Sequence, residues 1–185
     1  MTDMRLEDRQ LIQHQIIAYA RGVDRRDWDL VRSVYHPDAH DDHGAYKGGV
    51  EGFIEWLERR HAFIAQSMHF ATNCLIEFSG PETALAETYY LALQTMGPEA
   101  GESRAMLLGE RKMAPDASVI MQVAGRYIDL FEQRAGTWAI ARRVVVFEKV
   151  HAAVDTSLAI SADWAGQRRG PDDELGRLRR QLGLA

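Results

Sequence analysis

Residues 16–48 read IIAYARGVDRRDWDLVRSVYHPDAHDDHGAYKG, and they contain many of the chain's chemically informative side chains. An apolar helical segment precedes Gly22, and Asp24 follows shortly after that glycine. Because glycine commonly ends helices, we predict that the first helix stops at Gly22 and leaves the Asp24 carboxylate just beyond it. Tyr19 lies about one turn earlier on the same helix, and His, Asp and Tyr side chains follow closely. Several titratable groups can therefore converge on one cavity.

The composition is that of one acidic globular domain. The 185 residues include 22 Lys and Arg against 27 Asp and Glu, a formal net charge of −5, and no basic run. We therefore do not expect nucleic acid or membrane as partners, whereas small molecules and protein neighbours remain. The single cysteine, Cys74, lies in an apolar run, which indicates a buried thiol in a reducing compartment. Since we find neither a signal peptide nor an apolar stretch of membrane-spanning length, we expect a soluble, cytoplasmic protein.

Three helices are predicted in the first part of the chain. Residues 6–21 and 50–66 place apolar side chains at spacings of three and four, which is typical of amphipathic helices. Asp27 can cap a short helix over residues 28–35, which the following His-Pro pair should end. The polar, glycine-containing residues 37–49 are predicted to form a loop or a short edge strand.

The remainder of the domain is predicted to be a meander of strands. Four segments have the alternation or the β-branched content of strands: 69–78, 84–96, 119–134 and 138–150. Strict alternation would place His69 and Asn73 on one face of the first of these strands. Residues 97–104 read as a loop, and residues 105–113 are ambiguous between strand and helix.

Because the predicted helices precede the predicted strands along the chain, we expect an α+β fold, in which N-terminal helices pack on a curved, mainly antiparallel sheet. We expect a cone-shaped α+β barrel that encloses a pocket. The domain should span residues 1–150, and residues 151–185 should form a C-terminal tail with a possible short helix. That helix would carry its leucines on one side, at positions 175, 178 and 182.

Three stretches carry a resemblance to a known family: YARGVDRRDWDLVRSVYHPDA, the HF pair at residues 69–70, and GRYIDLFEQRAGTWAIARRVVVFE. Over roughly residues 5–150 the chain resembles the nuclear-transport-factor-2-like superfamily, in its SnoaL-like branch. It is most similar there to cofactor-free lyases: scytalone dehydratase, hexachlorocyclohexane dehydrochlorinase and bile-acid 7α-dehydratase. The superfamily also contains polyketide cyclases, a non-catalytic dioxygenase subunit and transport adaptors, so the fold alone does not define the function.

The resemblance implies roles for four residues and no cofactor. In those lyases an Asp after the first helix orients a His on the sheet, and that His removes a proton while a leaving group departs. Asp24 and His69 match this pair, Arg126 matches a pocket arginine, and Tyr19 matches a pocket tyrosine. The second pocket histidine of the fungal dehydratase and the lysine of the dehydrochlorinase have no match, so neither substrate carries over.

The residues by themselves also allow structural roles. Asp24 could cap a helix or pair with a neighbouring arginine, and His69 could be a core histidine bound to a backbone carbonyl. Arg126 could pair with Glu87 or Asp129 across the sheet. Tyr19 could be a core tyrosine whose hydroxyl reaches the rim.

Tyr46, His43 and Asn73 are further candidates for substrate contact, and Tyr19, Tyr46 and His43 are alternative proton donors. Five neighbouring side chains have the chemistry of metal ligands: His36, His40, Asp41, Asp42 and His43. No pair among them has the helical spacing that orients two ligands, so we predict no metal site.

We expect a cofactor-independent, dehydratase-type lyase that acts through an Asp–His dyad, as in aromatic compound catabolism. Its substrate would be a small hydrophobic, oxygenated molecule that is phenolic, aromatic or steroid-like. Loss of water is the favoured reaction, and retro-aldol deformylation, dehydrohalogenation and isomerisation are the other possible reactions. The alternatives are a non-catalytic ligand-binding or subunit protein and a polyketide-cyclase-type aldol cyclase. Strands 125–134 and 138–150 carry apolar residues on both faces, so we expect a homodimer or homotrimer unless the tail covers the outer face.

Overall fold

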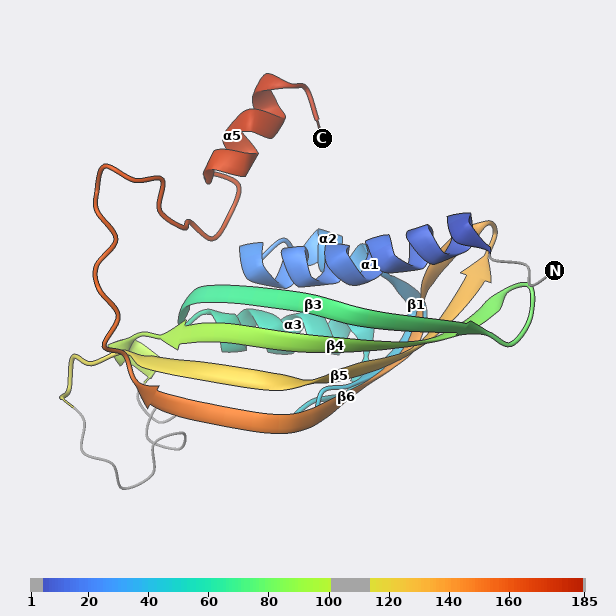
Figure 1. The fold of residues 1–185 in the computed structure, drawn as a ribbon, viewed down its shortest axis with the longest axis horizontal. Coiled ribbons are helices and arrows are strands. Elements are labelled where there is room, and N and C mark those ends of the chain that lie inside the picture. Colours follow the sequence, from blue (N-terminus) through green and yellow to red (C-terminus); the bar gives the residue numbers. More distant parts are fainter. Residues whose placement is uncertain (1–4, 101–113, 185) are drawn as a thin grey trace.

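The computed structural model describes residues 5–100 and 114–184, and three helices cover one face of its six-stranded sheet (Figure 1). These helices are α1 (Leu6–Arg25), α2 (Trp28–Ser33) and α3 (Val50–His61). The strands are β1 (Tyr35–Asp42), β2 (Lys47–Gly49), β3 (Ile64–Phe78), β4 (Thr83–Met96), β5 (Val119–Arg134) and β6 (Thr137–Val154). A 3-10 turn, η1 (Pro98–Ala100), follows β4, and α5 (Glu174–Gln181) lies in the tail. The ambiguous residues 105–113 lie outside the described residues.

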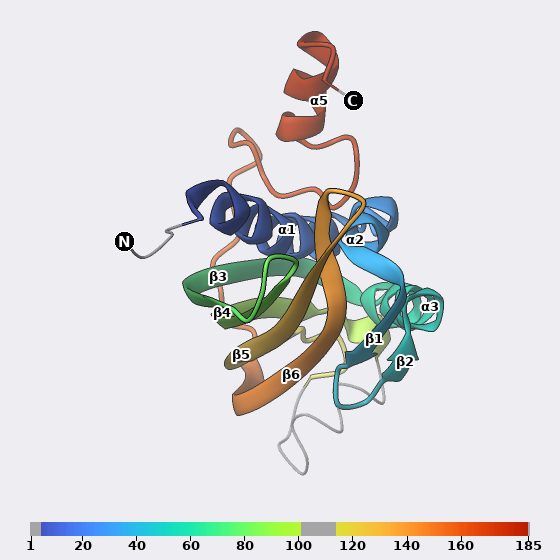
Figure 2. The ribbon, with the colours of Figure 1, turned by 90° about the vertical axis from the view of Figure 1, so that its right-hand side faces the viewer.

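The sheet has the order β2-β1-β6-β5-β4-β3, and it curls around the helices as an open cone (Figure 2). The α+β cone is confirmed, but the sheet is not closed into a barrel, because β2 and β3 remain its two edges. All pairings are antiparallel except that of β1 with β6, which is parallel. Most of the segment 37–49 is therefore strand rather than loop.

Gly22 lies inside α1 and does not end it. The helix continues to Arg25, and Arg26 adopts the left-handed conformation of a C-terminal cap. A Cβ atom on Gly22 would lie 2.7 Å from Cγ2 of Val31, so the glycine allows α2 to pack closely on α1. The predicted end at Gly22 is wrong, and Asp24 belongs to the last turn of the helix. The predicted Asp27 cap is confirmed, since its carboxylate accepts the backbone N–H of Leu30 at 3.0 Å.

The alternation along β3 changes at a bulge. Thr72 and Asn73 together lie opposite Tyr89 on β4, so β3 contains one extra residue there. Before the bulge His69 lies on the inner face, and after it Ile76 is buried. The bulge leaves Asn73 exposed, so the prediction that Asn73 shares a face with His69 is wrong.

Two further bulges curve the sheet around the core. Ala141 and Glu148 are extra residues of β6 opposite β5, and bulges increase local twist. Gly125 lies at one of them, where a Cβ atom would come within 2.0 Å of the Val146 carbonyl oxygen. Only glycine allows this close approach of the two strands, and the resulting curvature deepens the concave face that the helices cover.

The tail leaves the sheet after β6 and returns to the helical side, where α5 lies beyond α1 (Figure 1). An ion pair between Arg25 and Asp173 attaches it to the end of α1. The expected short helix is present, but the described part of the tail does not cover the outer face of the sheet. Within residues 5–100 and 114–184, no helix combines the length and the apolar character that a membrane span needs.

The outer face of β3 and β4 exposes large apolar side chains. They are Met68, Phe70, Leu75, Leu85, Tyr89 and Leu91. An apolar face of this kind on a soluble protein is usually covered by another protein surface.

We expect a second copy of the chain to cover this face, because closed symmetric assemblies are the commonest solution for soluble chains. Light scattering at micromolar concentration should give the mass of a dimer or trimer. Tyr89→Glu combined with Leu91→Glu should shift the mass towards the monomer, since a buried unpaired carboxylate is costly. Glu55→Lys, on the exposed face of α3, should leave the mass unchanged. A monomeric wild-type chain would contradict this expectation.

Candidate functional site

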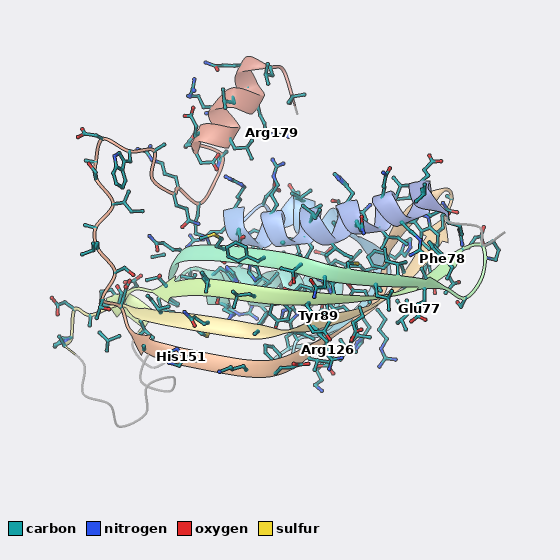
Figure 3. All side chains as sticks on the ribbon, viewed as in Figure 1. Glu77, Phe78, Tyr89, Arg126, His151 and Arg179 are labelled. Atoms are coloured by element: carbon teal, nitrogen blue, oxygen red, sulfur yellow. The ribbon has the colours of Figure 1, made fainter. Side chains whose placement is uncertain are left out.

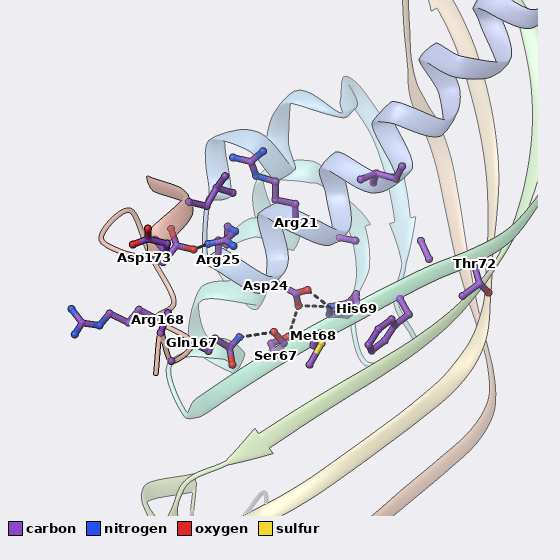
Figure 4. Close-up of a pocket in the computed structure, with 18 residues that line it drawn as sticks. Arg21, Asp24, Arg25, Ser67, Met68, His69, Thr72, Gln167, Arg168 and Asp173 are labelled. Atoms are coloured by element: carbon purple, nitrogen blue, oxygen red, sulfur yellow. Dashed lines mark hydrogen bonds and ion pairs between the residues drawn. The ribbon is translucent and has the colours of Figure 1, made fainter. Parts of the chain in front are cut away.

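The Asp24 carboxylate lies at the centre of a compact hydrogen-bonded group (Figure 4). It accepts hydrogen bonds from the Ser67 hydroxyl at 2.7 Å, the backbone N–H of His69 at 2.8 Å and ring Nδ1 of His69 at 2.6 Å. Burial raises the pKa of Asp24, but the hydrogen bonds and charge of His69, with the Ser67 hydroxyl, lower it below its usual value overall. Asp24 is therefore an ionised carboxylate held in a fixed position. The two residues that the sequence predicts as a pair do lie together.

His69 is oriented by this contact. Because Asp24 is ionised and accepts from Nδ1, the neutral imidazole carries its proton on Nδ1 and its lone pair on Nε2. Within the described part of the chain, no hydrogen bond is found to Nε2. The ring borders a cavity of about 380 Å³ that is partly open to solvent. An imidazole fixed in this way can accept a proton from a molecule in that cavity.

The cavity lies between the helices and the concave face of the sheet, and its size is near the lower end for small-molecule sites. Most of its wall is aromatic or aliphatic. These side chains include Trp56, Leu57, Tyr90, Met121, Val123 and Phe147. Polar side chains at the wall include His43, His61, Gln94 and Tyr19. The arrangement fits a largely apolar ligand with a few polar contacts.

Tyr19 borders the same cavity, as the sequence predicts. Its ring packs edge-on against Tyr35 and Tyr127, with centroids 6.2 and 5.6 Å away, and the side chain is buried. Burial raises the pKa of Tyr19, so its hydroxyl stays protonated and can act only as a neutral donor or acceptor.

A second Asp–His pair lies on the β1 side of the cavity. Nδ1 of His43 is 2.9 Å from Oδ1 of Asp41, and the hydroxyl of Tyr35 donates to Oδ2 of Asp41 at 2.7 Å. The His43 ring packs against Phe53, with centroids 4.9 Å apart, and borders the cavity. His43 is thus oriented by a carboxylate, as His69 is, and the Asp41 carboxylate is fully buried.

A buried arginine lies behind this pair, and the sequence did not reveal it. Arg143 on β6 donates from Nε and Nη2 to the two oxygens of Asp129, each at 2.7 Å, and both side chains are 0% exposed. Its guanidinium lies 4.1 Å from the ring centre of Tyr19 and 4.3 Å from that of Tyr127. Burial would lower the pKa of Arg143, but Asp129 holds it above its usual value.

Arg126 does not lie in the cavity, so the pocket position expected from the family resemblance is wrong. It lies on the outer face of the sheet, near Tyr89 (Figure 3), and pairs with Glu87 and Glu148 at 2.6 Å each. Alternation along β5 directs its neighbour Tyr127 inward instead.

The other candidates lie apart from the cavity. The Tyr46 hydroxyl donates to the Gly49 carbonyl at 2.6 Å, and Tyr46 is not among the cavity's lining residues. Asn73 is exposed at the β3 bulge. His36 contacts the Glu132 carbonyl through Nε2 at 2.9 Å, and His40 is exposed. No group of three or more His, Cys, Asp or Glu side chains within the described ranges is arranged to hold a metal ion.

The tail contributes contacts that the sequence did not indicate. Arg169 donates to the backbone carbonyls of Val23 at 2.8 Å, Asp24 at 2.8 Å and Ile64 at 2.6 Å. It also donates to Nδ1 of His61 at 2.7 Å. The tail is therefore fixed to the helix end that carries Asp24.

The tail also forms one wall of a groove outside the sheet. Gln167 donates to the Ser67 carbonyl at 2.9 Å, and a groove of about 680 Å³ lies between α1, β3 and this part of the tail (Figure 4). Asp24 and His69 line this groove as well, while His69 also lines the cavity. The dyad thus separates the two spaces.

The α+β cone is the fold of the nuclear-transport-factor-2-like superfamily. Within it, this chain belongs to the SnoaL-like family, because the model of the SnoaL-like domain matches residues 4–144. No curated protein sequence matches the chain significantly.

Solved structures of similar fold include known enzymes. LinA has a TM-score of 0.69 and 21% identity, covering 87% of this chain and 100% of its own. The hexachlorocyclohexane dehydrochlorinase LinA-type3 from Novosphingobium barchaimii has a TM-score of 0.65 and 19% identity, covering 85% and 96%. A scytalone dehydratase-like protein from Novosphingobium aromaticivorans has a TM-score of 0.64 and 16% identity, covering 91% and 99%. At these identities the likeness is one of fold.

The buried histidine His61 makes a prediction about stability. Burial first, and then the positive charges of Arg169 and Arg60, lower the pKa of His61 to about 2. Unfolded histidine titrates near pH 6.5, so below that pH the unfolded chain binds a proton that the folded chain does not. The free energy of unfolding should therefore fall by up to about 1.4 kcal/mol per pH unit below about pH 6.5.

Urea unfolding of wild type and His61→Leu between pH 7 and pH 5 measures this contribution. The variant should show a shallower dependence on pH, whatever its stability at pH 7. His40→Leu, which removes an exposed histidine, is the matched control and should keep the wild-type slope. Equal slopes in His61→Leu and wild type would show that His61 does not contribute.

Proposed function

We propose that this protein is a cofactor-independent lyase that acts on a small hydrophobic, oxygenated molecule, aromatic or steroid-like. The observation that carries the proposal is the 2.6 Å contact between Nδ1 of His69 and the partly buried Asp24 carboxylate, with the imidazole at the wall of an apolar cavity. This arrangement supports proton removal by His69.

The proposed reaction is an elimination that His69 starts. Nε2 removes a proton from a substrate carbon, and the electron pair of that C–H bond forms a double bond while a leaving group departs from the next carbon. Asp24 keeps the imidazole in the reactive tautomer and stabilises the imidazolium that forms. The hydroxyl of Tyr19, with the guanidinium of Arg143 over its ring, would stabilise negative charge that develops on a substrate oxygen.

The wall of the cavity supports the proposed class of substrate. Stacked Tyr90 and Tyr127, with centroids 4.3 Å apart, and the ring of Trp56 offer flat apolar surfaces. Such surfaces bind fused-ring or aromatic molecules well. The solved relatives whose names describe a dehydrochlorinase and a scytalone dehydratase-like protein support the breaking of a bond from carbon to oxygen or halogen.

A non-catalytic binding protein is the main alternative. It would need the cavity but not an imidazole that is hydrogen-bonded to a carboxylate and keeps a lone pair directed towards the ligand. The direct contact between His69 and Asp24, with no room for water between them, favours the enzyme. An aldol cyclase would use the same residues, and its products would distinguish it.

Substitution of the dyad tests the proposal. The substrates are bicyclic aromatic ketones with a hydroxyl or a chlorine on the β-carbon, whose elimination gives a conjugated product with new ultraviolet absorption. His69→Gln and Asp24→Asn should each lower kcat by about 10² to 10⁴-fold, since a positioned base and its orienting carboxylate contribute this much. His14→Gln, exposed on α1, should have no effect. Full activity in either dyad variant, with its fold verified by circular dichroism, would rule out the proposed base.

Removal of metal ions provides an independent test. The proposed elimination uses imidazole and carboxylate groups alone, so dialysis against EDTA should leave kcat and KM unchanged. Activity that is lost on dialysis and restored by a divalent cation would require a different mechanism.

A further inference from the structure

A continuous buried chain of polar contacts ends at the second cavity histidine. Asp129 binds Arg143 through two hydrogen bonds, and Nη1 of Arg143 lies 3.4 Å from the Tyr35 hydroxyl. Tyr35 donates to Asp41 at 2.7 Å, and Asp41 binds Nδ1 of His43 at 2.9 Å. Four of these five residues are buried, and only His43 reaches the cavity. The chain of contacts therefore fixes one imidazole and presents it to a bound molecule.

Charge balance within this network distinguishes His43 from His69. The charges of Asp129 and Arg143 cancel, which leaves Asp41 as a fully buried carboxylate whose direct partners are Tyr35 and His43. A buried carboxylate is costly unless a positive group compensates it, and a proton on His43 makes the network neutral.

The Asp24 pair has a different environment. Asp24 lies beside the guanidinium of Arg169, which donates to its backbone carbonyl, so a positive charge is already present there. His69 is therefore suited to be the base, and His43 to be the acid.

We propose that His43 is the general acid of the elimination, and that the leaving group is consequently hydroxyl, lost as water. The inference rests on the proposed function and specifies the chemistry of its second half. Hydroxide is a poor leaving group and needs a proton as its bond to carbon breaks, whereas chloride does not. A cavity with an acid on the β1 side and a base on β3 is suited to dehydration.

His69 takes the proton from the carbon next to a carbonyl, and the electron pair of that bond becomes the new carbon–carbon double bond. The bond from the β-carbon to oxygen breaks, and the oxygen takes a proton from Nε2 of His43 and departs as water. His69 is then protonated and His43 neutral, so a proton passes between them through water before the next turnover.

The other polar groups at the cavity are less suited to this role. The pKa of His61 is lowered to about 2 by burial and the nearby arginines, so His61 has no proton to give at neutral pH. Burial raises the pKa of Tyr19 and raises that of Tyr90 to about 12, which makes both phenols weak acids. Tyr46 is bound to a backbone carbonyl away from the cavity.

The test compares the β-hydroxyketone and the β-chloroketone of one bicyclic skeleton. His43→Gln should lower turnover of the hydroxyketone by about 10² to 10⁴-fold and that of the chloroketone by less than about tenfold, because its amide cannot supply a proton to the leaving oxygen. His69→Gln should lower both, and His40→Gln, at an exposed histidine of the neighbouring strand β1, should lower neither. Equal losses of both substrates in His43→Gln, or none, would overturn the assignment of His43. Unchanged turnover in His69→Gln would instead overturn the proposed base.

Nitrogen-15 spectra of the histidine rings provide a readout without substrate. Asp41→Asn should shift the ring signals of His43 and leave those of His69 in place, and Asp24→Asn should do the reverse. If Asp41→Asn leaves the His43 signals unchanged, His43 is not held by the buried network. The proposal then fails even in a protein that converts neither ketone.

Discussion

The Asp24 carboxylate joins the last turn of α1 to β3, an edge strand whose outward N–H groups no other strand of the described residues accepts. Unpaired backbone groups on a strand edge bind water or other strands, and native proteins protect them. Here one ionised group accepts the backbone N–H and the ring of His69 together with the Ser67 hydroxyl. These donors offset the cost of burying the charge. The position of the proposed base therefore depends directly on the packing of α1 against the sheet.

Periodicity in the sequence was sufficient to predict the three helices and most of the strands, whereas the pairing of Asp24 with His69 was implied by the family resemblance. Periodicity failed where one residue alters a regular pattern. Gly22 has the composition of a helix end, yet it serves the contact between α1 and Val31, which only a tertiary structure reveals. Strict alternation of side chains would place Asn73 on the inner face with His69, but the extra residue in the β3 bulge moves it to the surface. A bulge has no reliable signature in a single sequence.

The buried arginine also escaped prediction from the sequence, although the strand register could have revealed it. The family likeness pointed to Arg126, whereas Arg143 is the arginine behind the cavity. The RAGT turn sets the register of β5 and β6, and with one extra residue in β6 it brings Asp129 opposite Arg143. An acid and a base facing each other among β-branched and aromatic residues indicate a buried pair. The contacts of Arg169 could not be predicted, because they join segments far apart in the chain and end mostly on backbone atoms.

Binding through main-chain atoms affects how the sequence of such a chain can diversify. Three acceptors of Arg169 are main-chain carbonyls, of Val23, Asp24 and Ile64, and every amino acid offers the same carbonyl. Substitutions that reshape the cavity wall for a new ligand leave these acceptors in place as long as the backbone keeps its course. The tail, which lies beyond the family-matched residues 4–144, and the ligand specificity are thus separable traits. Selection can alter one of them while the other is inherited unchanged.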